Sequence, residues 1–258
     1  MRITALVENT CHNGNLDVEH GLSLFIETNH HIILFDMGQS ELFDQNAQRL
    51  GIDLSNVDIA ILSHGHYDHG GGLKRFLEIN KTASVFLSSF AFESHYNGTE
   101  KYIGLDCSLR SNNRLIFTDD IFEISPGLTL FSCNSNNKEF NLGSFGLTKL
   151  NNDEFIDDDF LHEQYLLIEE QGKKVLISGC SHKGILNIAN WFKPDVLIGG
   201  FHFSKLPLDD TLTEYANYLN KFSTRFYTCH CTGVEQYQYM KKSMSRLNYI
   251  STGDTIEL

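Results

Sequence analysis

The stretch of residues 59–73 reads IAILSHGHYDHGGGL, an apolar run that leads straight into histidines and an aspartate. Residues 57–62 are apolar and rich in β-branched side chains, which predicts a buried strand. His64, His66, Asp68 and His69 follow it, and imidazole together with carboxylate suits zinc, iron or manganese better than magnesium or calcium. Gly65 permits the tight backbone that such closely spaced ligands need. The stretch therefore predicts a transition-metal site.

Three other apolar runs also end in a histidine. They read VLISGCSHKGIL (residues 175–186), VLIGGFHF (residues 196–203) and FYTCHCTG (residues 226–233), and they place His182, His202 and His230 just after a predicted strand. In α/β proteins, sites form at the carboxyl ends of strands. A single histidine at such a place is usually structural, but four strands with the same ending favour a shared site.

The order of the expected elements indicates an α/β (α+β) fold with two mixed sheets flanked by helices. Strands are expected at residues 3–8, 22–27, 32–36, 57–62, 84–87, 128–133, 164–168, 175–177, 196–198, 225–228 and 255–258. Helices are expected at residues 40–50, 71–79, 183–192, 209–222 and 234–245. Residues 95–113 and the acidic residues 151–159 are expected to be polar loops. With 258 residues and only three prolines, we expect one domain spanning residues 1–258.

Charge and composition narrow the classes of partner. The formal net charge is -13, from 33 acidic and 20 basic residues, and such a field repels a phosphate backbone, so no nucleic acid is expected. The sequence has no apolar run of membrane-spanning length, and its N-terminus lacks the apolar core of a signal peptide. We therefore expect a cytoplasmic protein with a small-molecule substrate, no membrane association and six reduced cysteines, and we leave the oligomeric state open.

The remaining histidines and cysteines have ordinary interpretations. The histidines outside the strand ends lie in predicted loops, where exposure to solvent is expected for most of them: His12, His20, His30, His31 and His95. Cys229 and Cys231 flank His230 in a predicted extended segment. Because successive side chains of a strand point to opposite faces, we expect both thiols to point away from His230.

The pattern His64-x-His66-x-Asp68-His69 after an apolar strand resembles the signature of the metallo-β-lactamase superfamily. The resemblance implies an αβ/βα four-layer sandwich with one or two divalent metal ions, Zn²⁺ first and Fe or Mn as alternatives. It implies His64, His66, Asp68 and His69 as ligands, with His230 as the last family histidine. For the third histidine, His182 ranks first and His162 second.

One segment departs from the superfamily pattern. Most members carry a bridging aspartate where this chain has Cys180, which is either a thiolate ligand of a second metal or inert. Asp68 and His182 are the predicted catalytic residues. His202 is assigned to substrate binding or to a contact with the metal ligands.

The resemblance implies hydrolysis by a metal-bound hydroxide of a small phosphorylated or ester substrate. Several motifs, among them LVENT, LFDMGQS and HCTG, resemble a narrower branch that contains an archaeal dihydropterin-ribofuranosylaminobenzene phosphate synthase. A pterin-pyrophosphate transferase is therefore one alternative, and a non-enzymatic metal-binding or sensor protein is another. The predicted substrate-binding residues are Asn9, His20, Lys183 and Lys205.

Overall fold

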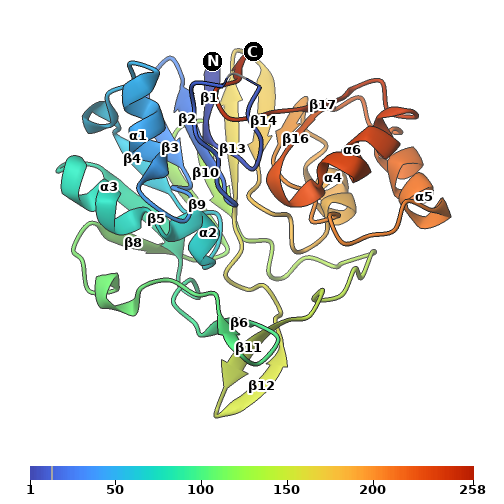
Figure 1. The fold of residues 1–258 in the computed structure, drawn as a ribbon, viewed down its shortest axis with the longest axis horizontal. Coiled ribbons are helices and arrows are strands. Elements are labelled where there is room, and N and C mark those ends of the chain that lie inside the picture. The colour runs from blue at the N-terminus through green and yellow to red at the C-terminus, as the bar shows by residue number, and fades with distance from the viewer. Residues whose placement is uncertain (13) are drawn as a thin grey trace. The chain divides into compact units, whose positions relative to one another are not determined.

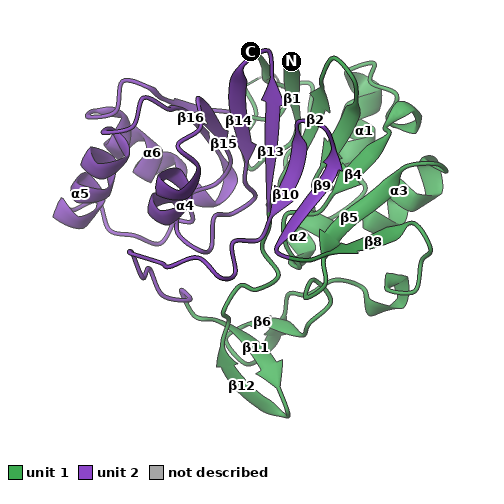
Figure 2. Cartoon of the chain, turned by 180° about the vertical axis from the view of Figure 1, so that it is seen from behind, with its two compact units in different colours: residues 1–119, 146–164, 251–258 green, residues 120–145, 165–250 purple. Residues whose placement is uncertain are grey.

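The computed structural model describes residues 1–12 and 14–258, which form two compact units. Unit 1 comprises residues 1–119, 146–164 and 251–258, and unit 2 comprises residues 120–145 and 165–250 (Figure 2). Each unit has its own seven-stranded sheet. The single domain expected from the sequence stays a prediction.

The main sheet of unit 1 is mixed, in the order β18-β1-β2-β3-β4-β5-β8. Its strands are β1 (Arg2–Val7), β2 (Ser23–Glu27), β3 (Ile32–Phe35), β4 (Ile59–Ile61), β5 (Ser84–Ser88), β8 (Leu115–Thr118) and β18 (Thr255–Glu257). Strands β18, β1, β2 and β3 pair antiparallel, whereas β3, β4, β5 and β8 pair parallel. The carboxyl ends of β3 and β4 therefore lie at the same edge of the sheet.

Helices cover the sheet of unit 1 (Figure 1). They are α1 (Leu42–Arg49), α2 (Tyr67–Gly70) and α3 (Leu73–Ile79), with 3-10 turns η1 (Leu54–Asn56) and η2 (Cys107–Leu109). Phe43 of α1 and Phe76 of α3 are fully buried in one core cluster with Leu34 of β3 and Ala60 of β4. As expected from its position, Gly51 follows the end of α1 with a left-handed φ of 71°.

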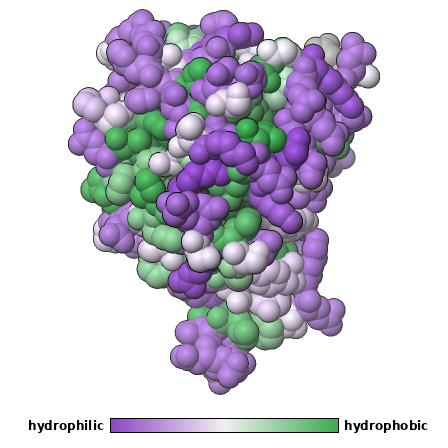
Figure 3. Space-filling view, turned by 90° about the vertical axis from the view of Figure 1, so that its left-hand side faces the viewer, coloured by the Kyte–Doolittle hydropathy of each residue, from purple (hydrophilic) through white to green (hydrophobic). Residues whose placement is uncertain are grey.

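A second, four-stranded sheet of unit 1 was not expected. Its order is β12-β11-β6-β7, from β6 (His95–Asn97), β7 (Lys101–Tyr102), β11 (Leu147–Asn151) and β12 (Glu154–Asp157). The predicted loops at residues 95–113 and 151–159 are therefore partly strand. Figure 3 shows hydrophilic residues at the lower end of the face in view, where β12 lies in Figure 1, with apolar residues beside them.

The sheet of unit 2 is also mixed, in the order β17-β16-β15-β14-β13-β10-β9. Its strands are β9 (Ile121–Ser125), β10 (Leu128–Phe131), β13 (Tyr165–Glu170), β14 (Lys173–Ile177), β15 (Val196–Ile198), β16 (Arg225–Thr228) and β17 (Leu247–Tyr249). Strands β14 to β17 pair parallel, so their carboxyl ends share one edge. This is the edge at which the sequence places its other histidines.

Three helices pack against the sheet of unit 2: α4 (Ile185–Phe192), α5 (Asp210–Leu219) and α6 (Val234–Lys241). Ile188 of α4, Ala216 of α5 and Met240 of α6 are fully buried in one core cluster. Asp209 caps α5 by accepting a hydrogen bond from the backbone N–H of Thr211.

The predicted fold class, with mixed sheets flanked by helices, is confirmed. Most predicted strands and all five predicted helices are present within a few residues of their expected bounds, and the last predicted strand is present as β18 at the edge of its sheet. Across the described part of the chain, the helices are all too short or too polar to cross a membrane.

Candidate metal centre

The histidine-rich segment of unit 1 begins where β4 ends and runs into α2. His64, His66 and His69 are buried, and the ring of His64 lies 4.6 Å from that of His66 and 4.2 Å from that of His69, between centroids. A Cβ on Gly65 would lie only 2.2 Å from the carbonyl oxygen of Ala91, so this position admits glycine alone. The structure thus brings the predicted histidines of unit 1 together.

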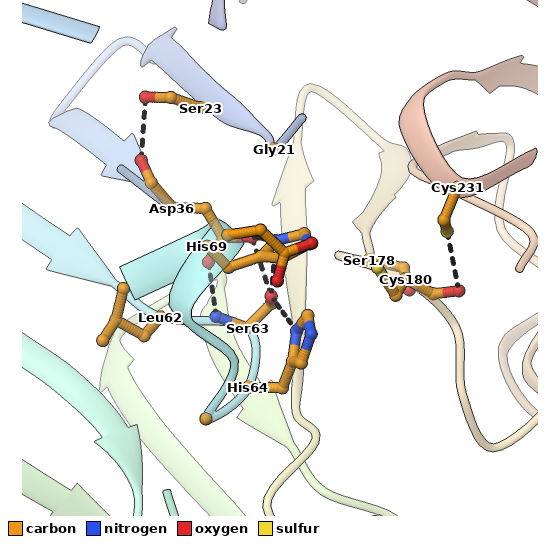
Figure 4. A network of polar contacts seen from close by, with 12 residues as sticks. Gly21, Ser23, Asp36, Leu62, Ser63, His64, His69, Ser178, Cys180 and Cys231 are labelled. Carbon is orange, nitrogen blue, oxygen red and sulfur yellow. Dashed lines mark hydrogen bonds and ion pairs between the residues drawn. The ribbon is translucent and has the colours of Figure 1, made fainter. Parts of the chain in front are cut away.

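Asp36 orients two of these histidines, although the sequence did not single it out as a site residue (Figure 4). It follows β3, whose parallel neighbour β4 leads to Ser63. Asp36 Oδ1 accepts the Ser63 N–H at 2.7 Å, while Oδ2 accepts the Ser63 hydroxyl at 2.7 Å and faces His69 Nδ1 at 2.6 Å. Ser63 Oγ in turn lies 2.8 Å from His64 Nδ1. A buried carboxylate therefore supports both rings.

These contacts fix which ring nitrogen each histidine presents. A carboxylate can only accept, so His69 Nδ1 carries the proton. The Ser63 hydroxyl donates to Asp36 and hence accepts from His64 Nδ1. In both rings Nε2 is left with the lone pair, which is the arrangement that metal-binding histidines show when a carboxylate or hydroxyl holds the other nitrogen.

Asp68 lies beside this pair. Its Oδ2 is 3.8 Å from His69 Nε2 and 3.3 Å from Nε2 of the exposed His20. Nδ1 of His20 is 3.3 Å from Asn9 Nδ2. Of the predicted substrate-binding residues, His20 thus lies next to a predicted metal ligand, and Asn9 lies next to His20.

His66 faces a second buried group of unit 1, formed by His95, Asp158 and His162. The donor atoms of these four residues lie within 4.8 Å of one another. His95 was expected to be exposed, but it is fully buried, because its strand β6 pairs on both sides in the unexpected sheet. Asp158, expected in a solvated loop, is buried as well.

Burial controls the protonation of this group. Loss of solvation, reinforced by the nearby His162, holds the pKa of His66 well below 6.5, so the ring stays neutral and able to bind a metal. Burial alone would raise the pKa of Asp158. The neighbouring His162 and the hydrogen bond with His95 outweigh burial and hold that pKa well below its usual range, so the carboxylate stays ionised.

Unit 2 gathers its own ligand-type residues at the shared edge of β14, β15 and β16. The donor atoms of Cys180, His182 and His202 lie within 4.8 Å of one another, and so do those of Cys180, His230 and Cys231. The histidines and Cys180 that the sequence places after separate strands are therefore neighbours within unit 2.

Cys231 differs from its expected position. Residues His230–Thr232 form the 3-10 turn η3, not an extended segment, so the alternation that would have turned Cys231 away from His230 does not apply. Its Sγ contacts the carbonyl oxygen of Cys180 at 3.5 Å (Figure 4). Burial opposes ionisation, but hydrogen bonds with Cys180 and His202 and the charge of His230 hold the pKa of the Cys231 thiol well below 9.0.

The backbone at this edge is held in unusual conformations. His202 and His230 have left-handed φ values of 57° and 49°, which non-glycine residues rarely adopt. A Cβ on Gly200 would lie 2.4 Å from Cys231 Sγ, so glycine makes room for the thiol. Strained backbone conformations of this kind are common where a structure holds functional side chains in place.

The two predicted lysines lie in unit 2. Lys183 is buried, and its Nζ donates to the carbonyl oxygen of Ser132 at 2.7 Å. Lys205 is exposed and donates to the carbonyl oxygen of Phe145 at 3.2 Å. A role of either lysine in holding substrate stays a prediction.

The donor set of unit 1 fits a divalent transition metal. Three buried imidazoles and one carboxylate are of the type that zinc and its neighbours prefer. The sequence missed Asp36, His95 and Asp158. Asp36 could have been recognised in the same way as the histidines, because it directly follows an apolar strand. No such pattern precedes His95 or Asp158.

The chain is similar to known proteins over most of its length. The family model described as metallo-beta-lactamase superfamily matches residues 16–222. The chain is similar to the solved structure of Tm1679, described as a metal-dependent hydrolase of the beta-lactamase superfamily, with a TM-score of 0.86 and 31% identity, covering 100% of this chain and 99% of that one.

Two proteins of Methanocaldococcus jannaschii are also similar. An uncharacterised protein is 29% identical over 242 residues, which is 90% of this chain and 91% of that protein. The 7,8-dihydropterin-6-methyl-4-(beta-D-ribofuranosyl)-aminobenzene-5'-phosphate synthase is 29% identical over 261 residues, covering 91% of this chain and 88% of the synthase.

Proposed function

This chain belongs to the metallo-beta-lactamase superfamily, and on that premise we propose that it is a metal-dependent hydrolase of a small phosphorylated or ester substrate. The observation that carries the proposal is the buried pair His64 and His69, whose Nε2 lone pairs are set by Ser63 and Asp36 next to the Asp68 carboxylate. Similarity to Tm1679, a metal-dependent hydrolase, supports it.

In this proposal His64, His66, Asp68 and His69 hold one or two divalent ions, with zinc as the first choice. A bound ion supplies Lewis acidity, which brings the pKa of a water toward neutrality. With an ion bound, Asp68 would orient a nucleophile or carry a proton, and Asn9 and His20 would contact the substrate. The ligands from unit 2 predicted from the sequence, His182, His230 and Cys180, stay predictions. So do His162 as the alternative third histidine and His202 beside the substrate or the metal ligands.

The proposal extends to partners and compartment. A formal net charge of -13 supports a small-molecule substrate over nucleic acid. None of the six cysteines, all of which lie in the described part of the chain, takes part in a disulfide, which supports a reducing compartment such as the cytoplasm.

A second candidate is a transferase of the pterin-synthase type. The similarity to the archaeal synthase, which covers 91% of this chain, favours it. In that case the same carboxylate and imidazole donors would hold the metal, and the metal would supply positive charge to a pyrophosphate leaving group.

One experiment tests both candidates. Protein purified without added metal is analysed for Zn, Fe and Mn and assayed on phosphodiesters, thioesters, lactones and a pterin pyrophosphate with its aminobenzene acceptor. We expect bound metal and turnover of at least one ester class, with a fall of about 10²–10⁴-fold in Asp68→Ala. His30→Ala, which changes an exposed histidine, is the matched control.

The outcomes separate the candidates. Turnover of the pterin substrates and of no ester would refute the hydrolase proposal in favour of the transferase. Two results together would refute the proposal and favour a non-enzymatic protein. The wild type would turn over none of the substrates, and a His64→Ala/His66→Ala variant would keep the metal content of the wild type.

A further inference from the structure

Three loops of unit 2 carry, in chain order, a thiol, an imidazole and a second thiol. Cys180 follows β14, His202 follows β15 and Cys231 follows β16. These strands are parallel neighbours, so the loops after them leave the sheet at one edge. Cys180 and Cys231 are buried, and His202 is partly buried.

The donor atoms of the three residues lie close together. Cys180 Sγ is within 4.8 Å of a ring nitrogen of His202 and of Cys231 Sγ. Cys231 also forms hydrogen bonds with Cys180 and His202 (Figure 4 shows the contact with Cys180). In a tetrahedral zinc site two sulfur ligands lie about 3.8 Å apart, and a sulfur and a nitrogen ligand about 3.5 Å. Side-chain shifts of about 1 Å would therefore bring all three donors onto one ion.

The backbone holds the three loops at fixed spacing. A Cβ on Gly199 would lie 2.0 Å from the carbonyl oxygen of Ser178, so the loops after β14 and β15 approach as closely as only glycine permits. The Ser204 N–H donates to the carbonyl oxygen of Cys231 at 3.0 Å, which links the loops after β15 and β16. The fold therefore positions the three donors before any ion binds.

The ring of His202 is also held in place. Its centroid lies 4.4 Å from that of His182 and 4.9 Å from that of Phe145. His202 Nδ1 is buried and has no hydrogen-bond partner among the residues that the structure describes. A buried polar atom without a partner costs about 1–3 kcal/mol, and coordination of the ring to an ion would offset that cost.

The chemistry of these donors selects the kind of ion. Two thiolates and one imidazole suit zinc and other thiophilic ions, and they disfavour magnesium and calcium, which prefer oxygen. The histidine-rich segment of unit 1 offers imidazole and carboxylate but no sulfur. Sulfur coordination therefore distinguishes an ion bound in unit 2 from an ion bound by that segment.

We propose that Cys180, His202 and Cys231 bind one zinc ion in unit 2, separate from any ion that the histidine-rich segment holds. Three protein ligands leave the fourth position to a water molecule. The site does not require His230, whose donor atom is also within 4.8 Å of both sulfurs. The resemblance to the superfamily gives neither Cys231 nor His202 a ligand role, and the inference does not depend on the proposed function.

The test measures metal coordination and needs no substrate. Zinc content is determined after loading with Zn²⁺ and removal of the free ion, and X-ray absorption of the zinc protein detects sulfur ligands. The Co²⁺-substituted protein is examined for the charge-transfer absorption that thiolate ligands produce. In the wild type we expect zinc–sulfur bonds of about 2.3 Å and this absorption.

Variants then identify the ligands. Cys180→Ser, Cys231→Ser and His202→Ala should each lose one zinc equivalent, and the two serine variants should also lose most of the thiolate absorption. Cys133→Ser is the matched control, because Cys133 lies in the core of the same unit and is as exposed as Cys231, at 6%. It should keep the zinc content and the absorption of the wild type.

Two results would refute the inference directly. The first is a wild-type protein with neither zinc–sulfur bonds nor thiolate absorption, a measurement that does not require any variant to fold. The second is a Cys231→Ser protein that keeps the zinc content and the cobalt absorption of the wild type.

A His64→Ala/His66→Ala variant separates this site from the proposed function. The thiolate absorption should persist in it, whereas the zinc of the histidine-rich segment should be lost. Loss of the absorption together with all bound zinc would show that the sulfurs belong to the same ion, which would refute a separate site. Persistence of the absorption with unchanged zinc content would support the thiolate site and count against the proposed function.

Discussion

At the scale of the residue, Asp36 combines a strained backbone conformation with a side chain that holds neighbouring side chains in place. Its φ of 59° is left-handed, which costs a non-glycine residue about 1–2 kcal/mol. In return its carboxylate accepts from the N–H and hydroxyl of Ser63 and faces His69, and its own carbonyl oxygen accepts from Ser23. One strained residue thereby orders both buried rings at the end of β4.

Protonation of His66 gives a prediction for the metal-free protein. Its folded-state pKa is well below 6.5, whereas the unfolded chain titrates near 6.5, so below that pH the unfolded state binds the extra proton. Lowering the pH from 6.5 should therefore reduce the free energy of unfolding, by up to about 1.4 kcal/mol per pH unit for this one group. The slope from this group fades as the pH rises above 6.5, because the unfolded chain then also loses the proton.

Denaturant unfolding in the presence of a chelator checks this between pH 7.5 and 5.5. His66→Gln should show a shallower dependence on pH than the wild type, and His30→Gln should match the wild type. Equal slopes in the wild type and His66→Gln would show that burial does not depress the pKa of His66.

At the scale of the element, the ligand-type residues of each unit follow strands that end side by side within that unit. The apolar runs around β4, β14, β15 and β16 were recognisable because each contains buried apolar residues and a ligand-type side chain follows it. The strands of the small sheet were not, because β12 is exposed along its whole length and β7 has only two residues. Without hydrophobic alternation, nothing in the sequence placed His95 or Asp158 in the interior.

The turn between β4 and α2 gives a second prediction. In Gly65→Ala the new Cβ would lie 2.2 Å from the Ala91 carbonyl oxygen, so the segment must shift and His64 and His66 with it. We expect a loss of about 1–3 kcal/mol in the free energy of unfolding and clearly weaker Zn²⁺ binding. Gly14→Ala, where nothing lies within 4 Å, is the control. Wild-type metal affinity in Gly65→Ala would contradict the tight packing of this turn.

At the scale of the whole molecule, unit 1 joins segments from both ends of the sequence. Strand β18 pairs with β1, and Thr252 Oγ1 accepts the Glu8 N–H at 2.8 Å and donates to the Glu8 carbonyl oxygen at 3.1 Å. Thr252 and Glu8 are fully buried. The last residues are therefore part of the structure that carries the histidine-rich segment.

Replacement of this hydroxyl tests the link. Thr252→Val keeps the shape of the side chain but leaves two buried backbone groups of Glu8 without a partner. We expect it to lower the free energy of unfolding by about 1–3 kcal/mol. Thr99→Val, at an exposed position of a turn, should change it by less than about 0.5 kcal/mol. If both variants change the free energy of unfolding by similarly small amounts, the hydrogen bonds of Thr252 do not stabilise unit 1.

The interleaving of the two units also has a consequence for synthesis. Because residues 251–258 belong to unit 1, the unit that begins the chain cannot be completed until residue 258 has left the ribosome. At about 5–20 residues per second, the first strands wait roughly 12–50 s for their last partner. During that time the edge of β1 is open to wrong pairing. Chaperone demand in the cell should therefore follow translation speed, and slow codons late in the message should prolong the exposure.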